Sequence, residues 1–69
     1  MMPNELTGNE VLRKYIKFSG ISMKDLADRA GISRQSIWNH VTGKYGIGLH
    51  AARKYSKASG IDVAKFIKL

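Results

Sequence analysis

The side chains best suited to chemistry in this sequence follow one serine at helical spacing. At 3.6 residues per turn, positions 34, 35, 38, 39 and 42 share one arc of roughly 140° on a helix. An arginine can pair with O6 and N7 of guanine, and a glutamine or asparagine with N6 and N7 of adenine, each pair giving about 1–3 kcal/mol of discrimination. The arc therefore predicts a surface that reads base edges, made of Arg34, Gln35, Trp38, Asn39 and Thr42.

Trp38 is the member of this surface whose role is open between two interpretations. Its indole can press on thymine methyl groups or the sugar edge, or it can fold back against Tyr45 as peripheral core. Ile37 and Val41 lie on the opposite, inward side. We expect His40, also on that side, to be a half-buried, hydrogen-bonding residue rather than a pH switch.

Two short helices joined by a tight turn are needed to position this surface, and residues 22–43 predict them. Each helix begins with a capping serine, Ser22 or Ser33. Each ends at a glycine, Gly31 or Gly43, because glycine accepts the positive φ that redirects the chain. The helices are expected over residues 22–30 and 34–41 or 34–42, with Leu26, Ala27 and Ala30 facing inward from the first.

Helices are also expected on both sides of this segment. Apolar periodicity predicts a helix over Asn9–Ser19 with Asn9 as its N-cap, after a loose leader over residues 1–8. Further helices are expected over Leu49–Ser59 and over residues 61–69. A chain this small is not expected to bury every apolar side chain of the last helix, so the exposed remainder favours a dimer contact. The residues concerned are Val63, Phe66, Ile67 and Leu69.

Length and charge limit the possible functions. The 69 residues suit one domain, spanning residues 1–69, and the lack of cysteine excludes disulfides and thiolate metal sites. A net charge of +7 implies a polyanionic partner, either nucleic acid or an anionic membrane. No apolar run approaches the roughly 20 residues of a membrane span, and no secretory signal is present. We therefore expect a soluble, cytoplasmic protein with no metal, no cofactor and no small-molecule ligand.

Cations beside the two short helices are the expected source of contacts to DNA phosphates. Lys24 lies in the first turn of the first helix, and Lys44 and Tyr45 come directly after the second. The flexible loop over residues 43–48 contains three glycines, but it lacks the preceding strand and the following Lys-Ser or Lys-Thr of a nucleotide-binding loop. Smaller contributions to phosphate binding are expected from Lys14, Lys17 and Arg53.

Residues 22–43 resemble the helix-turn-helix of the Cro and repressor family of phage and bacterial regulators. The matching residues, at the family's spacing, are Leu26, Ala27, Gly31, Ile32, Ser33, Ile37 and Gly43. The later segment Ala58-Ser59-Gly60-Ile61-Asp62 is similar to the family's Ala-Leu-Gly-Val-Ser, so the resemblance covers about residues 9–69. It implies an all-α, five-helix, lambda-repressor-like domain, usually dimeric, that binds a nearly palindromic DNA operator.

The resemblance also implies roles for individual residues. Base reading falls on Arg34, Gln35, Trp38 and Asn39, and phosphate contacts fall near the start of the first short helix and on Ser33, Thr42, Lys44 and Tyr45. Three positions depart from the family's pattern. Met23 replaces a backbone-anchoring glutamine, so that contact reduces to main-chain N–H groups or passes to Lys24. His40 stands at a usually apolar or aromatic site. Val41 replaces a glutamate that pairs with a helix-one arginine, so we expect that ion pair to be absent.

Three other classes of function compete with DNA binding. An enzyme is disfavoured because the sequence offers only five carboxylates, and no Ser, His and Asp set is expected to converge. A membrane-surface peptide is disfavoured because the charges are spread over several helices separated by glycines. An antitoxin or a restriction–modification controller can use the same fold and stays an alternative, although no acidic tail is present to block a toxin. The sequence favours a homodimeric transcriptional regulator, more specifically a Cro-like repressor.

Overall fold

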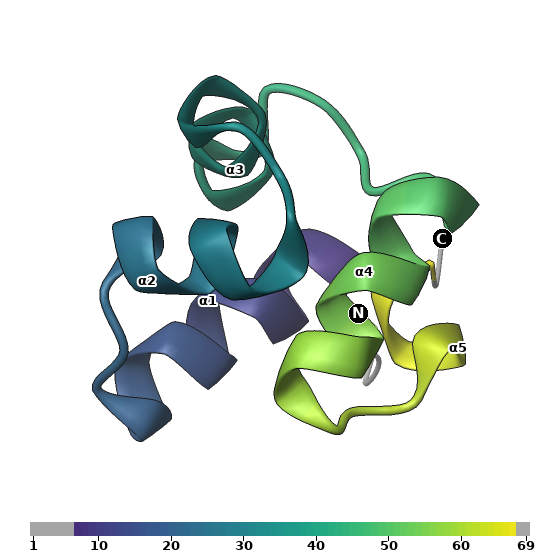
Figure 1. Ribbon diagram of the computed structural model, residues 1–69. Coiled ribbons are helices and arrows are strands. Elements are labelled where there is room, and N and C mark those ends of the chain that lie inside the picture. The colour runs from purple at the N-terminus through teal and green to yellow at the C-terminus, as the bar shows by residue number, and fades with distance from the viewer. Residues whose placement is uncertain (1–6, 68–69) are drawn as a thin grey trace, which may run out of the picture.

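Five α-helices pack around one small core in the computed structural model, which describes residues 7–67 (Figure 1). No strand occurs within this range, so the expected all-α class is confirmed. In Figure 1, α3 lies above α2, and α4 and α5 lie to the right. The helices are α1 (Gly8–Ser19), α2 (Met23–Ala30), α3 (Arg34–Thr42), α4 (Leu49–Ser59) and α5 (Val63–Phe66).

The caps predicted around α2 and α3 are present. The Oγ atom of Ser22 accepts a hydrogen bond from the backbone N–H of residue 25 at 3.0 Å, and that of Ser33 from residue 36 at 3.1 Å. Gly31 and Gly43 take left-handed backbone conformations, with φ of 69° and 80°. Because these local signals set the ends of both helices, their predicted bounds agree with the structure to within one residue.

The predicted start of α1 is wrong, because Thr7 and not Asn9 is its N-cap. The backbone N–H of Glu10 donates to Thr7 Oγ1 at 3.2 Å, and the Glu10 carboxylate accepts from the Thr7 backbone N–H at 2.9 Å. This reciprocal capping box lowers the pKa of Glu10, chiefly through the backbone hydrogen bond from Thr7. Thr7 and Gly8 therefore belong to α1 rather than to a loose leader, and residues 1–6 of that expected leader lie outside the described residues.

The core is built from all five helices and from one loop residue. The inward positions expected for α2 are confirmed, since Leu26, Ala27 and Ala30 are buried. Ile47 is also buried, so the loop that we expected to be flexible is anchored to the core. The remaining buried apolar side chains are Leu12, Ile37, Ala52, Tyr55 and Phe66.

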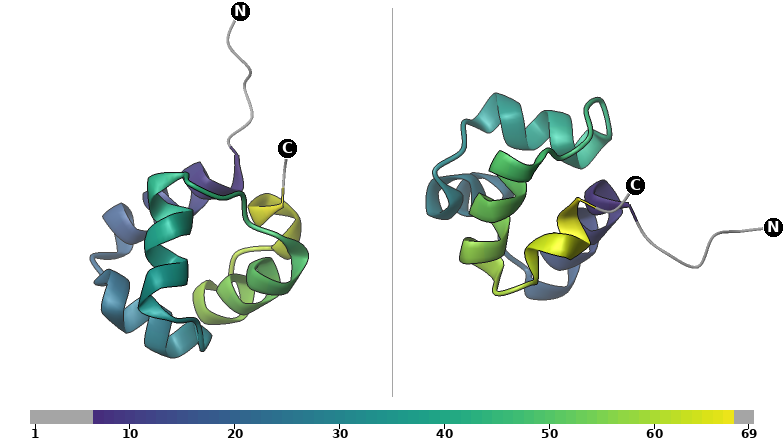
Figure 2. Two further views of the ribbon diagram at one scale, coloured as in Figure 1. Left: turned by 90° about the horizontal axis from the view of Figure 1, so that it is seen from above. Right: turned by 90° about the vertical axis from the view of Figure 1, so that its right-hand side faces the viewer.

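The C-terminal helix is shorter than the helix expected over residues 61–69. Asp62 caps α5 by accepting from the backbone N–H of residue 64 at 3.1 Å, and the helix ends at Phe66. The start of α1 lies directly against this end, where the backbone of Phe66 approaches Gly8, and Figure 2 shows the two helices side by side.

This arrangement corrects one residue of the expected dimer contact. The Phe66 side chain is 1% exposed and packs against the Tyr55 ring, with ring centroids 5.8 Å apart, so it belongs to the core of the single chain. Val63 and Ile67 are half-buried at the edge of the core. Leu69, the fourth residue of that prediction, lies outside the described residues.

Candidate nucleic-acid interface

The outward side of α3 carries the four residues to which the resemblance assigns base reading, and Thr42, the fifth residue of the predicted arc, is exposed at the end of the same helix. Arg34, Gln35 and Trp38 are exposed and Asn39 is half-buried, whereas Ile37 on the opposite side is 1% exposed. The structure therefore brings the predicted residues together on one surface. We call the surface formed by Arg34, Gln35, Trp38 and Asn39 the α3 face.

Two members of the α3 face are hydrogen-bonded to each other. The Gln35 side-chain amide donates to Asn39 Oδ1 at 3.0 Å, across one helical turn. This leaves the Gln35 carbonyl as an acceptor and the Asn39 amide as a donor, which is the combination that matches N6 and N7 of adenine. The hydrogen bond favours an arrangement in which both groups lie side by side on the surface of α3.

Trp38 does not fold back against Tyr45, which was one of the two interpretations of its role, whereas the other, a contact with thymine methyl groups or the sugar edge, stays a prediction. Its side chain is 53% exposed, and it lines a shallow pocket with Met23 and Lys24 from the start of α2 and with Arg34 one turn earlier on α3. The indole thus lies toward α2, away from the side of α3 that leads to Tyr45. The partly covered indole and Lys24 line the same pocket, so an aromatic ring and a cation lie near each other at the edge of the α3 face.

The hydroxyl groups of Ser33 and Thr42 already have partners within α3. Ser33 Oγ accepts from the Ser36 backbone N–H and donates to Ser36 Oγ at 2.9 Å. Thr42 Oγ1 donates to the backbone carbonyl of Trp38 at 2.8 Å. A phosphate oxygen needs a donor, so either hydroxyl must turn away from its present acceptor before it can contact phosphate.

Two side chains from α1 hold the C-terminal end of α3, and sequence reasoning missed both. Asn9 Nδ2 donates to the backbone carbonyls of His40 at 2.7 Å and of Tyr45 at 2.9 Å. Arg13, one turn later on α1, donates from Nη1 to the carbonyl of Val41 at 2.8 Å. The His40 carbonyl also accepts from the backbone N–H of Gly43 at 3.2 Å, so Asn9 adds a second donor there, and the bonds from Asn9 and Arg13 together tie the C-terminal end of α3 and the following loop to α1.

The sequence predicted that an ion pair between an arginine of the first helix and position 41 is absent, and Arg13 instead bonds the backbone at that position. With Val41 at this position there is no carboxylate for the arginine to meet, and its guanidinium bonds the backbone carbonyl instead. The C-terminal end of a helix carries partial negative charge, so a cation is stabilising there. The connection between α1 and α3 is therefore kept without the acidic side chain.

Lys44 and Tyr45 follow α3 at the place where phosphate contacts were predicted. The Lys44 ammonium lies 5.7 Å from the centroid of the Tyr45 ring, within cation–π range. The backbone N–H of Lys44 donates to the carbonyl of Asn39 at 2.9 Å, which ties this segment to the last turn of α3. Both side chains are exposed beside the end of the α3 face, and Lys24 is exposed near its start.

His40 is half-buried and hydrogen-bonded behind the α3 face, as expected. Its Nδ1 lies 2.7 Å from Tyr55 Oη, and the two rings meet edge to face with centroids 5.6 Å apart. Burial lowers the pKa of His40 and raises that of Tyr55. Both groups are therefore neutral at physiological pH, which suits a tyrosine O–H that donates to an unprotonated imidazole nitrogen.

The described residues offer little chemistry besides this surface. Among residues 7–67, no three His, Asp or Glu side chains lie close enough to share a metal ion, and no helix has the length and apolar character needed to cross a bilayer. No protein-family model, curated protein or solved structure matches the chain.

Proposed function

We propose that the chain binds double-stranded DNA and regulates transcription, with α3 lying in the major groove. The observation that carries this proposal is the α3 face itself, where an arginine and a hydrogen-bonded Gln35–Asn39 pair project from one side of a short helix. These are the side chains whose donors and acceptors match the major-groove edges of guanine and adenine. The major groove is wide enough to admit a helix.

The cations near both ends of α3 support the same proposal. Lys24 lies near its start and Lys44 follows its end, so a helix in the groove would place one ammonium toward each flanking phosphate strand. The first backbone N–H groups of α2 and α3 are further donors suited to phosphate oxygens. Phosphate contacts of this kind fix orientation, while the α3 face would supply sequence preference.

The arrangement of α2 and α3 is the part of the fold that this function needs. We infer that residues 22–43 form a helix-turn-helix like that of the Cro and repressor family, within a lambda-repressor-like domain. A homodimer on a nearly palindromic operator, acting as a repressor, belongs to the same proposal. The dimer contact would then use Val63 and Ile67, because Phe66 is already buried within one chain.

Two substitutions separate base reading from phosphate binding. Arg34→Ala should cost about 1–3 kcal/mol on the preferred sequence and relax specificity at one base pair per half-site. Lys44→Ala should weaken binding to all duplexes alike and reduce the slope of log affinity against log salt by about one. Fluorescence anisotropy measures both effects at several salt concentrations. It uses a duplex of the preferred sequence, obtained by selection from a random library, and a duplex of random sequence.

Lys57→Ala is the matched control, because Lys57 is an exposed cation on α4. It should change neither the specificity nor, beyond a small long-range effect, the affinity. If Arg34→Ala and Lys57→Ala weaken binding equally on specific and random DNA, α3 does not read bases.

A further inference from the structure

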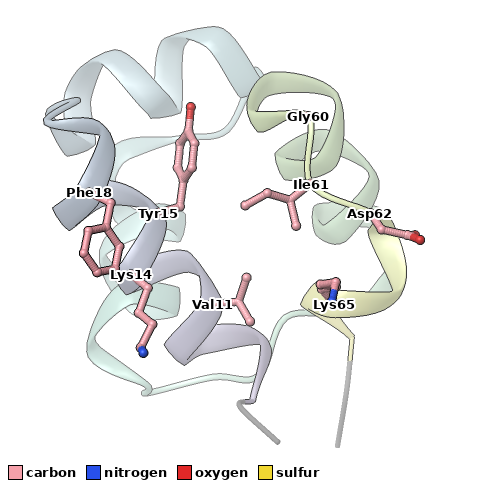
Figure 3. A pocket seen from close by; sticks show the side chains of 8 residues that line it. All are labelled: Val11, Lys14, Tyr15, Phe18, Gly60, Ile61, Asp62 and Lys65. Carbon is pink, nitrogen blue, oxygen red and sulfur yellow. The ribbon is translucent and has the colours of Figure 1, made fainter.

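A second surface, lined by α1, by the turn between α4 and α5 and by Lys65 of α5, forms an open groove of about 640 Å³ (Figure 3). Its apolar wall is made by Val11, Tyr15 and Phe18 from α1 and by Ile61 from the turn. We call it the α1–α5 groove. Its volume falls within the range of about 300–1,000 Å³ typical of binding pockets, but it is open rather than enclosed.

Phe18 leaves a large apolar area exposed beside this groove. Its ring is 79% exposed, which makes it the most exposed large apolar side chain among the described residues. Covering such a ring is worth about 1.5–3 kcal/mol. An apolar groove with an exposed aromatic ring at its mouth is the kind of patch at which proteins bind one another.

The charge around the groove indicates what the partner carries. Lys14 stands one turn before Phe18, and Lys65 lies on the opposite side of the groove (Figure 3). Asp62 also lines the groove, but its carboxylate points away from the apolar wall and accepts the capping hydrogen bond of α5. The charged residues around the apolar wall are therefore two lysines and one aspartate whose carboxylate is used in the cap of α5.

A second copy of the chain is a poor match for this charge. A symmetric contact through the groove would bring both copies of Lys14 and Lys65 to one interface, unlike a contact through Val63 and Ile67. Like charges brought together at an interface oppose association. A partner with apolar side chains flanked by carboxylates satisfies both features.

The position of the groove leaves it free when α3 is engaged. Its lining comes only from α1 and from residues 60–65, and these segments lie on the lower side of the molecule in Figure 1, with α3 at the top. A partner in the groove and DNA on the α3 face would thus occupy different sides. This inference does not depend on the proposed DNA binding.

We propose that the α1–α5 groove binds a short acidic amphipathic helix of another protein. The apolar face of that helix lies on Tyr15, Phe18 and Ile61, and its carboxylates pair with Lys14 and Lys65. This is the mode in which an amphipathic helix places its apolar face in a hydrophobic groove.

The proposal is tested with a designed peptide as the probe. A fluorescent helical peptide with leucines on one face and glutamates beside them is titrated with the full chain, together with a second peptide in which lysine replaces every glutamate. The acidic peptide should bind, and the lysine peptide should bind at least about tenfold more weakly, a difference of about 1.4 kcal/mol. Chemical-shift changes caused by the acidic peptide should centre on residues 11–18 and 60–65.

Three variants locate the site. Phe18→Ser should weaken the acidic peptide about tenfold, and Lys14→Glu combined with Lys65→Glu should weaken it further while strengthening the lysine peptide. Lys57→Glu, which has the same change of charge on α4, should leave binding within about twofold. All of these side chains are exposed, and a thermal melt of each variant verifies that the fold is kept.

Several results would overturn the proposal. One is that the acidic peptide does not bind, and another is that the groove variants do not weaken its binding. A third is that the chemical-shift changes caused by the acidic peptide centre on α3. Closure of the groove by a second copy, seen as a dimer that Phe18→Ser dissociates, would also overturn it.

Discussion

His40 and Tyr55 connect the α3 face to the core through one polar contact. The imidazole comes from α3 and the phenol from α4, and their hydrogen bond is 2.7 Å long. A protonated imidazole can only donate from both nitrogens, so charging His40 would force the tyrosine hydroxyl to reverse its role. Charging it would also place a cation in a site where burial already disfavours charge.

Stability should therefore fall as the solution is acidified below the ordinary pKa of histidine. Because the pKa of His40 is lowered from 6.5 in the folded chain, the unfolded chain binds the proton first as the pH decreases. The contribution of neutral His40 to the free energy of unfolding is complete above pH 6.5, the pKa of the unfolded chain. It is lost as the pH falls from 6.5 through the lower pKa of the folded chain, and it does not return at still lower pH.

Urea unfolding across this pH range measures the effect, with His40→Gln as the comparison. The variant should lose the pH dependence that His40 causes, and an NMR titration of the wild-type ring should give a pKa below 6.5. A ring that titrates above 6.5 would mean that the folded chain favours the charged form.

Gly8 is the glycine that the fold requires for space rather than for a special backbone angle. A Cβ atom at this position would lie 1.7 Å from the carbonyl oxygen of Phe66, so Gly8→Ala must push α1 away from α5. We expect a loss of about 1–3 kcal/mol of unfolding free energy, which corresponds to a fall in Tm of several degrees.

Gly46→Ala is the matched control for Gly8→Ala. A Cβ atom there meets nothing within 4 Å, and Gly46 is not among the glycines with a positive φ. A thermal melt of both variants is sufficient. Equal Tm values would contradict the close approach of α1 and the end of α5.

At the scale of the elements, side chains of α1 hold the C-terminal end of α3 in its position. Asn9 and Arg13 are spaced four residues apart, so both project from the same side of α1 toward the end of α3. Asn9 makes the more demanding contact, because it bridges the carbonyls of His40 and Tyr45. The direction of α3 therefore depends on side chains outside the α2–α3 segment.

Removing these contacts should loosen the end of α3 locally. Asn9→Ala removes the donor shared by the carbonyls of His40 and Tyr45, although the His40 carbonyl keeps its bond from the Gly43 backbone N–H, and should cost about 0.5–1.5 kcal/mol. Arg13→Ala removes a single exposed contact and should cost less. Amide hydrogen exchange should quicken at Gly43 and Lys44 in both variants. Lys17→Ala, an exposed substitution on the same helix, is the control, and equal exchange in all three variants would contradict this role of α1.

The sequence predicted the elements best where their ends are set by neighbouring residues. Ser22, Gly31, Ser33 and Gly43 act through hydrogen bonds and φ angles within a few residues, so α2 and α3 could be bounded without any tertiary information. The start of α1 had a similar local signal, Thr7 followed three residues later by glutamate, which we missed in favour of Asn9.

Features that depend on distant packing could not be predicted. Asn9 is a good capping residue, and nothing in its neighbourhood indicates that its amide reaches a carbonyl 31 residues away. The end of α5 and the burial of Phe66 likewise depend on where α1 begins. The α3 face, in contrast, follows from helical periodicity alone.

At the scale of the whole molecule, the two surfaces lie on different sides of one small core. The α3 face combines hydrogen-bonding side chains with Lys24 and Lys44 near its two ends, and the α1–α5 groove combines an apolar wall with Lys14 and Lys65. Both surfaces carry cations, so the overall composition indicated an anionic partner but did not predict the groove.

The most direct test of DNA recognition is selection of bound sequences from a random duplex library, using the full chain at moderate salt. The proposed function predicts enrichment of a motif with two related half-sites whose centres lie about 34 Å apart, one helical turn. The same selection with Arg34→Ala should lose preference at one position of each half-site. Failure to bind duplex DNA, or binding without enrichment of any sequence, would contradict the claim that α3 reads the major groove.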